Sequence, residues 1–102
     1  MTYSVYFTKS ADADLDGILE FIAEDSLENA LTFIDRLQTR IVNTLGEQPF
    51  VGLRYHDFYY LSFNNYIVIY DIDQDNQAVY IHLVTEGHRQ WKMLLDTHFS
   101  NF

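Results

Sequence analysis

Two β-rich runs separated by a short polar turn constrain the fold of this chain more than any other feature. Residues 66–70 are five strand formers with no breaker, and residues 79–84 form a second such run. The polar residues 73–77 lie between them, so the stretch 66–86 predicts an antiparallel hairpin. Both runs are apolar on both faces. This predicts that both faces are covered and that the hairpin lies at the centre of a sheet.

A short strand and a first amphipathic helix are predicted near the N-terminus. Residues 3–8 alternate in the manner of a strand. Ser10 is the predicted N-cap of the helix, and Asp12 and Asp14 follow in the first turn, where the helix dipole favours acidic side chains. The apolar residues that share one helix face are Ala11, Leu15, Ile18 and Ile22.

A second, longer helix is predicted to follow after a short break. Ser26 is its predicted N-cap, Gly46 is predicted to end it as a C′ residue, and Pro49 prevents its return. Its apolar stripe consists of Ala30, Ile34, Leu37, Ile41 and Leu45. So short a link between the two helices predicts an antiparallel helical hairpin.

The second half of the chain supplies the rest of the sheet. Residues 55–63 predict a strand, Asn64 and Asn65 predict a tight turn, and Gly87 is predicted to end the sheet. Residues 88–95 have helical spacing, and residues 97–102 are predicted to be a loosely held tail. The predicted fold is α+β: an N-terminal strand, a helical hairpin on one face of a mostly antiparallel four-stranded sheet, and a short C-terminal helix.

Length and charge limit what such a fold can do. A chain of 102 residues predicts a single domain over 1–102. The absence of cysteine and of any signal-peptide or membrane-spanning pattern predicts a cytoplasmic protein. Fifteen acidic residues against six basic ones give a formal charge of −9. That charge counts against a general nucleic-acid binder and favours a basic partner.

Four motifs follow one another along the chain. They read A-x-x-D-L-x-x-I-x-x-F-I over 11–22, A-x-x-F over 30–33 followed by Leu37, Ile41, Leu45, Pro49 and Gly52, N-Y-I-V-I-Y over 65–70, and V-x-E-G-H-R-Q-W over 84–91. In this order and at these distances they resemble the RelE/ParE superfamily, the toxins of bacterial type II toxin–antitoxin modules of the plasmid-stabilisation type. The resemblance covers most of the chain and implies the same α+β fold.

The resemblance implies two mechanisms and several partners. RelE-like members cut mRNA on the ribosome, whereas ParE-like members inhibit DNA gyrase without a clear catalytic set. In both branches an antitoxin wraps the toxin and neutralises it. A cognate antitoxin, with gyrase or the ribosome and its mRNA as target, is therefore expected, in a homodimer or a heterotetramer with the antitoxin. No cofactor, metal or membrane partner is expected.

Candidate site residues lie in the strand half of the chain. Cleavage of RNA by its own 2′-OH needs a base, an acid and cations for the phosphate. The candidate catalytic residues of a RelE-like enzyme are Arg89, Arg54, His88 and Glu86; the candidate binding residues are Arg89, Trp91, Lys92, His56 and Tyr60. All of these could instead be ordinary solvated residues near strand ends, although Arg89 matches the superfamily's C-terminal arginine. His82, inside a strand, is predicted to be a packed histidine.

Departures from the superfamily pattern favour the ParE branch. Ile67 stands where the family often has arginine, and Glu86 replaces the family histidine. The basic residues common in RelE-like strands are replaced by Tyr59, Tyr60 and Leu61. The sequence therefore supports three hypotheses: a ParE-like toxin, a RelE-like endoribonuclease, and an interaction module of the same fold that has lost toxicity. Because the helices are acidic, the contacting segment of the antitoxin is predicted to be basic.

Overall fold

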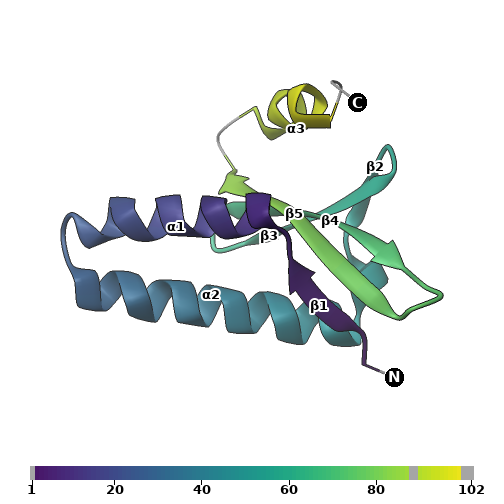
Figure 1. Ribbon diagram of the computed structural model, residues 1–102, viewed down its shortest axis with the longest axis horizontal. Helices are drawn as coiled ribbons and strands as arrows, with labels where there is room; N and C mark the ends of the chain where they lie inside the picture. Colours follow the sequence, from purple (N-terminus) through teal and green to yellow (C-terminus); the bar gives the residue numbers. More distant parts are fainter. Residues whose placement is uncertain (1, 88–89, 100–102) are drawn as a thin grey trace.

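The computed structural model describes residues 2–87 and 90–99, which form three α-helices, a short 3₁₀ helix and five strands (Figure 1). In chain order they are β1 (Ser4–Phe7), α1 (Lys9–Ala23), α2 (Leu27–Glu47), η1 (Pro49–Val51), β2 (Leu53–Tyr55), β3 (Phe58–Phe63), β4 (Tyr66–Asp73), β5 (Ala78–Glu86) and α3 (Trp91–Phe99). This order confirms the predicted α+β class. Within the described residues, none of the helices is long and apolar enough to cross a bilayer.

The sheet has the strand order β1-β5-β4-β3-β2, so the predicted hairpin does lie inside it. β1 runs parallel to β5, and the other neighbours are antiparallel. The prediction of four strands was wrong, because the run 55–63 is broken by a turn at His56 and Asp57 that separates β2 from β3. His56 has a φ of 55°, a left-handed conformation that a continuous strand does not allow. Asn64 and Asn65, by contrast, form the predicted tight turn with φ of 48° and 71°.

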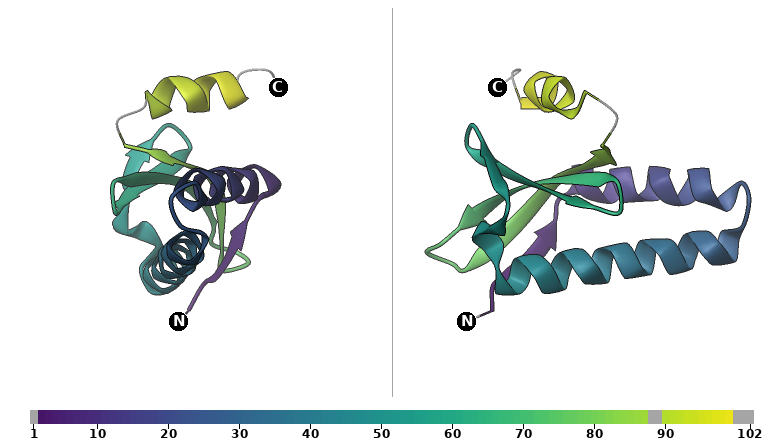
Figure 2. Two further views of the ribbon diagram at one scale, coloured as in Figure 1. Left: turned by 90° about the vertical axis from the view of Figure 1, so that its left-hand side faces the viewer. Right: turned by 180° about the vertical axis from the view of Figure 1, so that it is seen from behind.

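Both long helices cover the same face of the sheet and run antiparallel to each other, as predicted (Figures 1 and 2). Their buried residues meet those of the sheet in one core: Ala11, Leu15, Leu37, Ile41, Leu45, Phe63, Val68, Tyr70, Val79, Ile81 and Val84. The stripe predicted from helical spacing is therefore the face that packs on the sheet.

The start of α1 differs from the prediction by two residues. Thr8, not Ser10, is the N-cap: its hydroxyl accepts from the Ala11 N–H at 3.2 Å. The Thr8 N–H also donates to the Ile81 carbonyl at 3.0 Å, so β1 passes directly into the helix. Consequently Asp12 lies in the first turn, but Asp14 does not. At the second helix the prediction is confirmed, because the Ser26 hydroxyl accepts from the Asn29 N–H.

Gly46 was predicted to end α2, and this prediction was wrong. The helix continues to Glu47 and is capped by Gln48, and Gly46 is buried in its last turn. The Tyr3 N–H donates to the Gly46 carbonyl at 2.7 Å, and a Cβ at Gly46 would lie 3.2 Å from the Tyr3 carbonyl oxygen. The glycine therefore allows the N-terminal segment to approach the helix closely.

Gly52 and Tyr70 tie the end of the helical hairpin to the central strand. The Gly52 N–H donates to the Tyr70 hydroxyl at 3.1 Å, and that hydroxyl donates to the Pro49 carbonyl at 2.9 Å. A Cβ at Gly52 would collide with the same hydroxyl and would lie 2.8 Å from the Tyr60 carbonyl oxygen. Burial raises the pKa of Tyr70 from 10.0 to about 12. Tyr70 is thus a neutral hydrogen-bonding residue inside the core.

The opposite face of the sheet is partly covered by α3, which lies across the sheet from α2 (Figure 2). Leu95 of α3 is buried, and Ile69, on the strand face opposite Val68 and Tyr70, is also fully buried. The helix runs from Trp91 to Phe99, so the prediction of a loose tail from Thr97 was wrong for residues 97–99. The predicted helix start at His88 lies outside the described residues.

Candidate functional site

Most of the predicted binding residues meet on the face of the sheet that carries α3. The Trp91 ring lies 4.5 Å from the ring of Tyr60 and 5.4 Å, edge on, from that of Tyr55. The Lys92 Nζ lies 5.3 Å from the centroid of the Tyr55 ring, and the His56 ring lies 4.4 Å from it. The structure thus brings together Trp91, Lys92, His56 and Tyr60, which we call the aromatic cluster.

Asp96 completes the attachment of α3 to this cluster. The Tyr55 hydroxyl donates to the Asp96 carboxylate at 3.2 Å. Burial, together with this carboxylate, raises the pKa of Tyr55. Aromatic pairs of this geometry stabilise by roughly 0.5–1.5 kcal/mol beyond their area. The cluster therefore has a clear structural role in holding α3 on the sheet.

Arg54 points to the other side of the sheet. Its guanidinium lies 4.8 Å from the centroid of the Tyr59 ring and donates to the Tyr59 hydroxyl at 3.0 Å and to the His56 carbonyl at 3.2 Å. Tyr59 stacks on the core residue Tyr70 at 5.6 Å. Arg54 is therefore held by contacts at the outer strand, on the face of the sheet away from Trp91 and Lys92.

Glu86 lies far from Arg54. Glu86 is opposite Tyr66 in the register of β4 and β5, whereas Arg54 aligns through Tyr59 with Tyr70. Four residues of β4 separate these positions, roughly 13 Å at ~3.3 Å per residue. The other two candidate catalytic residues, His88 and Arg89, lie outside the described residues. The catalytic role of this set stays a prediction.

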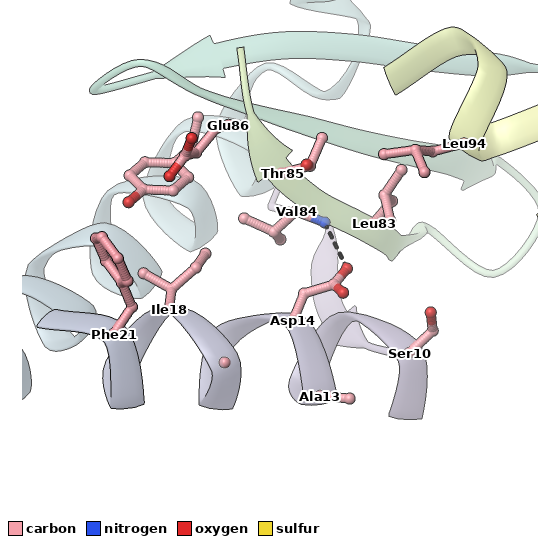
Figure 3. Close-up of a pocket in the computed structure, with 12 residues that line it drawn as sticks. Ser10, Ala13, Asp14, Ile18, Phe21, Leu83, Val84, Thr85, Glu86 and Leu94 are labelled. Atoms are coloured by element: carbon pink, nitrogen blue, oxygen red, sulfur yellow. Dashed lines mark hydrogen bonds between the residues drawn. The ribbon is translucent and has the colours of Figure 1, made fainter. Parts of the chain in front are cut away.

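A hollow on the described surface lies elsewhere, between α1, the outer edge of β5 and α3 (Figure 3). Its volume is about 580 Å³. From α1 it is lined by Ser10, Ala13, Asp14, Gly17, Ile18 and Phe21. From the sheet and α3 it is lined by Tyr66, Leu83, Val84, Thr85, Glu86 and Leu94. We call this the α1–β5 groove.

The groove exists because β1 is shorter than β5. The two strands pair only from Ser4 opposite Ala78 to Phe7 opposite Ile81, after which the chain turns into α1. Beyond Ile81, no described strand pairs with the outer edge of β5. Asp14 compensates in part, since its carboxylate accepts from the Val84 N–H at 3.0 Å (Figure 3). A carboxylate on a helix thus replaces a strand neighbour at this point.

The groove is apolar and acidic. Phe21 is 67% exposed and Leu94 is 41% exposed, so two large apolar side chains of the groove are open to solvent. Among its described lining residues two are acidic, Asp14 and Glu86, and none is basic. Burial raises the pKa of Tyr66 in the groove, and the nearby Glu86 carboxylate raises it further. Tyr66 is therefore a neutral donor at the groove wall.

A third feature is an acid–histidine pair on β4 and β5. His82 Nε2 lies 2.8 Å from Asp71 Oδ2, and Phe58 contacts the imidazole edge on at 5.6 Å. His82 is the extra residue of a β-bulge, because Ile69 aligns with Leu83 but Tyr70 aligns with Ile81. The prediction that His82 is a packed histidine agrees with its low exposure. Within residues 2–87 and 90–99, no group of three metal-ligating side chains is present.

Sequence reasoning missed the groove and the pairing of Asp14 with β5. The 3.6-residue period places Asp14 beside the apolar face of α1, but only the end of β1 at Phe7 exposes the N–H that it accepts from. The signal in the sequence was Gly17 in the middle of the first helix, where glycine costs roughly 1 kcal/mol relative to alanine.

Comparison with known proteins identifies the family. The sequence profile described as "ParE toxin of type II toxin-antitoxin system, parDE" matches residues 5–91. No curated protein sequence matches the chain. Among solved structures, the chromosomal ParDE system from P. aeruginosa is similar with a TM-score of 0.67 at 17% identity, covering 83% of this chain and 96% of that one.

Two further structures belong to RelE proteins. The RelBE2 toxin–antitoxin complex from Mycobacterium tuberculosis is 25% identical, with a TM-score of 0.57 and coverage of 84% of this chain and 99% of that one. A double arginine mutant of the E. coli toxin RelE in its free state is 18% identical, with a TM-score of 0.65 and coverage of 92% and 93%. These structures confirm the RelE/ParE-like fold, and with the profile match they show that this chain belongs to the ParE toxin family of type II toxin–antitoxin systems.

Proposed function

We propose that this protein is a ParE-like toxin that inhibits growth by binding a protein target such as DNA gyrase, and that a cognate antitoxin neutralises it. The observation that carries the proposal is that the described candidate residues Arg54, Lys92 and Glu86 lie apart from one another and do not surround one point. Arg54 contacts Tyr59 on the helix side of the sheet, and Lys92 lies on aromatic rings on the opposite side. Glu86 lies in the groove, about four residues along β4 from Arg54.

The chemistry of RNA cleavage explains why this scattering matters. A phosphate in the transition state is stabilised by donors and cations arranged around one point. The described cations are not arranged in that way, and a formal charge of −9 repels the phosphate backbone over most of the surface. A protein target imposes no such requirement, since recognition then depends on apolar and aromatic contacts.

A supercoiling assay tests the proposal. Purified gyrase relaxes or supercoils plasmid DNA in the presence of increasing amounts of this protein, with the protein premixed with its antitoxin as a control. We expect supercoiling to fall with dose and to recover with antitoxin. Unchanged supercoiling at high molar excess would contradict the gyrase target.

RelE-like mRNA cleavage is the second candidate, favoured by the similarity to the RelBE2 complex and by the aromatic cluster, on which bases could stack. It predicts cuts in mRNA in a translating extract, and their loss in Arg89→Ala. If the mRNA in the extract stays intact, the RelE-like hypothesis is contradicted. Normal growth on expression without antitoxin would instead support a non-toxic interaction module.

An antitoxin partner is supported by the family and by the solved complexes of similar toxins. The acidic helices support a basic contacting segment: Asp12, Asp16, Glu20, Glu24 and Glu28 are all exposed on or beside α1 and α2. A homodimer, or a heterotetramer with the antitoxin, is the proposed assembly. Affinity that falls with ionic strength would support the charge argument.

A further inference from the structure

We propose that Asp14 blocks an open edge of the sheet, and that it thereby prevents a second copy of this chain from adding its own β5 at that edge. The edge belongs to the last residues of β5, beyond the point where β1 ends. The blocking role is independent of the proposed function, because it concerns what keeps two copies apart and not what the protein inhibits.

The open edge consists of backbone groups that point away from β4. The Gly87 N–H donates to the Asn65 carbonyl at 2.7 Å, so it points toward β4. N–H groups alternate in direction along a strand, and the N–H groups of Glu86 and Val84 therefore point to the outer side. No described strand pairs with β5 on that side beyond Ile81. Such a row of outward groups is a template for an added strand.

Asp14 occupies the first of these outward donors. Its carboxylate accepts from the Val84 N–H at 3.0 Å, across seventy residues of sequence (Figure 3). An ionised carboxylate only accepts hydrogen bonds, so it cannot continue the ladder as a strand would. It also places a negative charge beside the edge. Charged side chains that point at an edge are one way in which natural sheets prevent edge pairing.

Asp14 closes the edge sterically as well. Val84 is 3% exposed and Thr85 is 7% exposed, although both line a groove of about 580 Å³. Truncation of Asp14 to alanine removes the carboxylate that lies between the Val84 N–H and this groove (Figure 3). Asparagine keeps an acceptor oxygen in the same place. The two substitutions therefore differ in whether the edge is open.

A second β5 is the strand that fits this edge. Antiparallel pairing about a two-fold axis at Val84 places Leu83 opposite Thr85 of the second copy. The same pairing places Glu86 opposite His82 of the second copy. No two acidic residues then face each other within residues 82–86, whereas contact through the acidic sides of α1 and α2 would bring like charges together. Leucine, valine and threonine at the centre of this segment also favour a strand.

Sedimentation velocity of full-length variants tests the proposal. Samples from about 20 μM to about 0.5 mM are compared in about 0.3 M salt, which screens the formal charge of −9. We expect the average mass of Asp14→Ala to rise at least about 1.5-fold over this range, above that of the original protein. Asp14→Asn should sediment like the original protein. Asp16→Ala removes the same charge from an exposed position on α1 and is the matched control.

A proline at position 86 tests whether the association uses this edge. Glu86→Pro removes an outward N–H at an exposed position and leaves the Gly87 N–H on Asn65. Proline on an edge strand blocks pairing with another chain. When it is combined with Asp14→Ala, it should restore the mass of the original protein. In Asp14→Ala alone, hydrogen exchange of the Glu86 N–H should slow as the protein concentration rises.

The variants decide the proposal as a set. Association of Asp14→Ala that reverses on dilution, is stopped by the proline and is absent from Asp16→Ala supports it. A folded Asp14→Ala that sediments like the original protein at about 0.5 mM overturns it, and so does association that the proline leaves unchanged. Asp14→Ser, whose side chain is one atom shorter than needed to reach Val84, replaces Asp14→Ala if circular dichroism shows that the alanine variant is unfolded.

The result is separate from that of the gyrase assay. None of these measurements uses gyrase or an antitoxin, so a monomeric Asp14→Ala leaves the proposed target untouched. Unchanged supercoiling would likewise leave the role of Asp14 at the edge of β5 untouched.

Discussion

The two faces of the sheet are held in different ways. The face toward α1 and α2 is a continuous apolar core in which Leu37, Ile41 and Val68 have no solvent exposure. The face toward α3 carries separate aromatic contacts. Trp91 contacts Tyr60 at one end, and the exposed Tyr6 stacks on Tyr80 at the other. A closed core determines stability, whereas a partly covered face leaves side chains available for other molecules.

This difference predicts where a mutation unfolds the protein and where it changes only a local contact. Changes on the core face should alter the free energy of unfolding of the whole chain. Changes on the α3 face should act mainly on α3 or on one pair of side chains. Four sets of measurements test this difference between the two faces.

The largest effect is expected from Leu37→Ala. Leu37 is fully buried between α2 and the sheet, so its truncation leaves a cavity and should cost about 2–5 kcal/mol of the free energy of unfolding. Urea denaturation followed by circular dichroism measures this. Tyr6→Ala on the other face, where the side chain is 52% exposed, should cost less than about 1 kcal/mol. Similar costs for both variants would contradict the contrast between the faces.

Tyr70→Phe should have the next largest effect. It leaves the Gly52 N–H and the Pro49 carbonyl without their partner in the core, at a cost of roughly 1–3 kcal/mol. Because the folded pKa of Tyr70 is raised to about 12, its contribution is complete below pH 10 and is lost as the pH rises from 10 through 12.

That alkaline loss should therefore be smaller in Tyr70→Phe than in the original protein. Denaturation curves between pH 8 and 11.5 measure it. Tyr59→Phe is the matched control, because its hydroxyl accepts from an exposed arginine. An alkaline profile unchanged by Tyr70→Phe would show that this tyrosine is not the group that titrates.

Trp91→Ala should detach α3 without unfolding the core. The ring contacts with Tyr55 and Tyr60 are lost, which weakens the docking of α3 by about 1–2 kcal/mol. Hydrogen exchange of the α3 amides should accelerate about tenfold, while the amides of β4 keep their protection. Met93→Ala, at a position 63% exposed, is the control. Equal acceleration in β4 would mean that α3 belongs to the core.

The smallest effect is expected for the pair of Asp71 and His82. A double-mutant cycle with Asp71→Asn and His82→Gln should give a coupling of roughly 0.5–1 kcal/mol, because both side chains keep some contact with water. A coupling of zero would show that the two side chains are close but do not stabilise the fold.

Part of the candidate site followed from sequence patterns and part did not. The strand-rich 55–63 stretch and the helical spacing after Gly87 correctly placed Tyr60, Trp91 and Lys92 in the same half of the molecule. Whether Arg54 faced the same side as Trp91 could not be predicted, because the turn at His56 sets the register of β2. A shift of one residue in a strand reverses the face of every side chain in it.

Local sequence patterns were enough to predict the helical hairpin, the apolar stripes of α1 and α2, the cap at Ser26, the turn at Asn64–Asn65 and the central β-hairpin. These follow from period, propensity and turn chemistry, which act between residues close together in the chain. Packing in three dimensions was needed to show that β1 stops at Phe7, that Asp14 accepts from the Val84 N–H, and that Gly46 and Gly52 admit distant backbone or hydroxyl groups. Those outcomes depend on distances between residues far apart in sequence, and such distances exist only once the chain has packed.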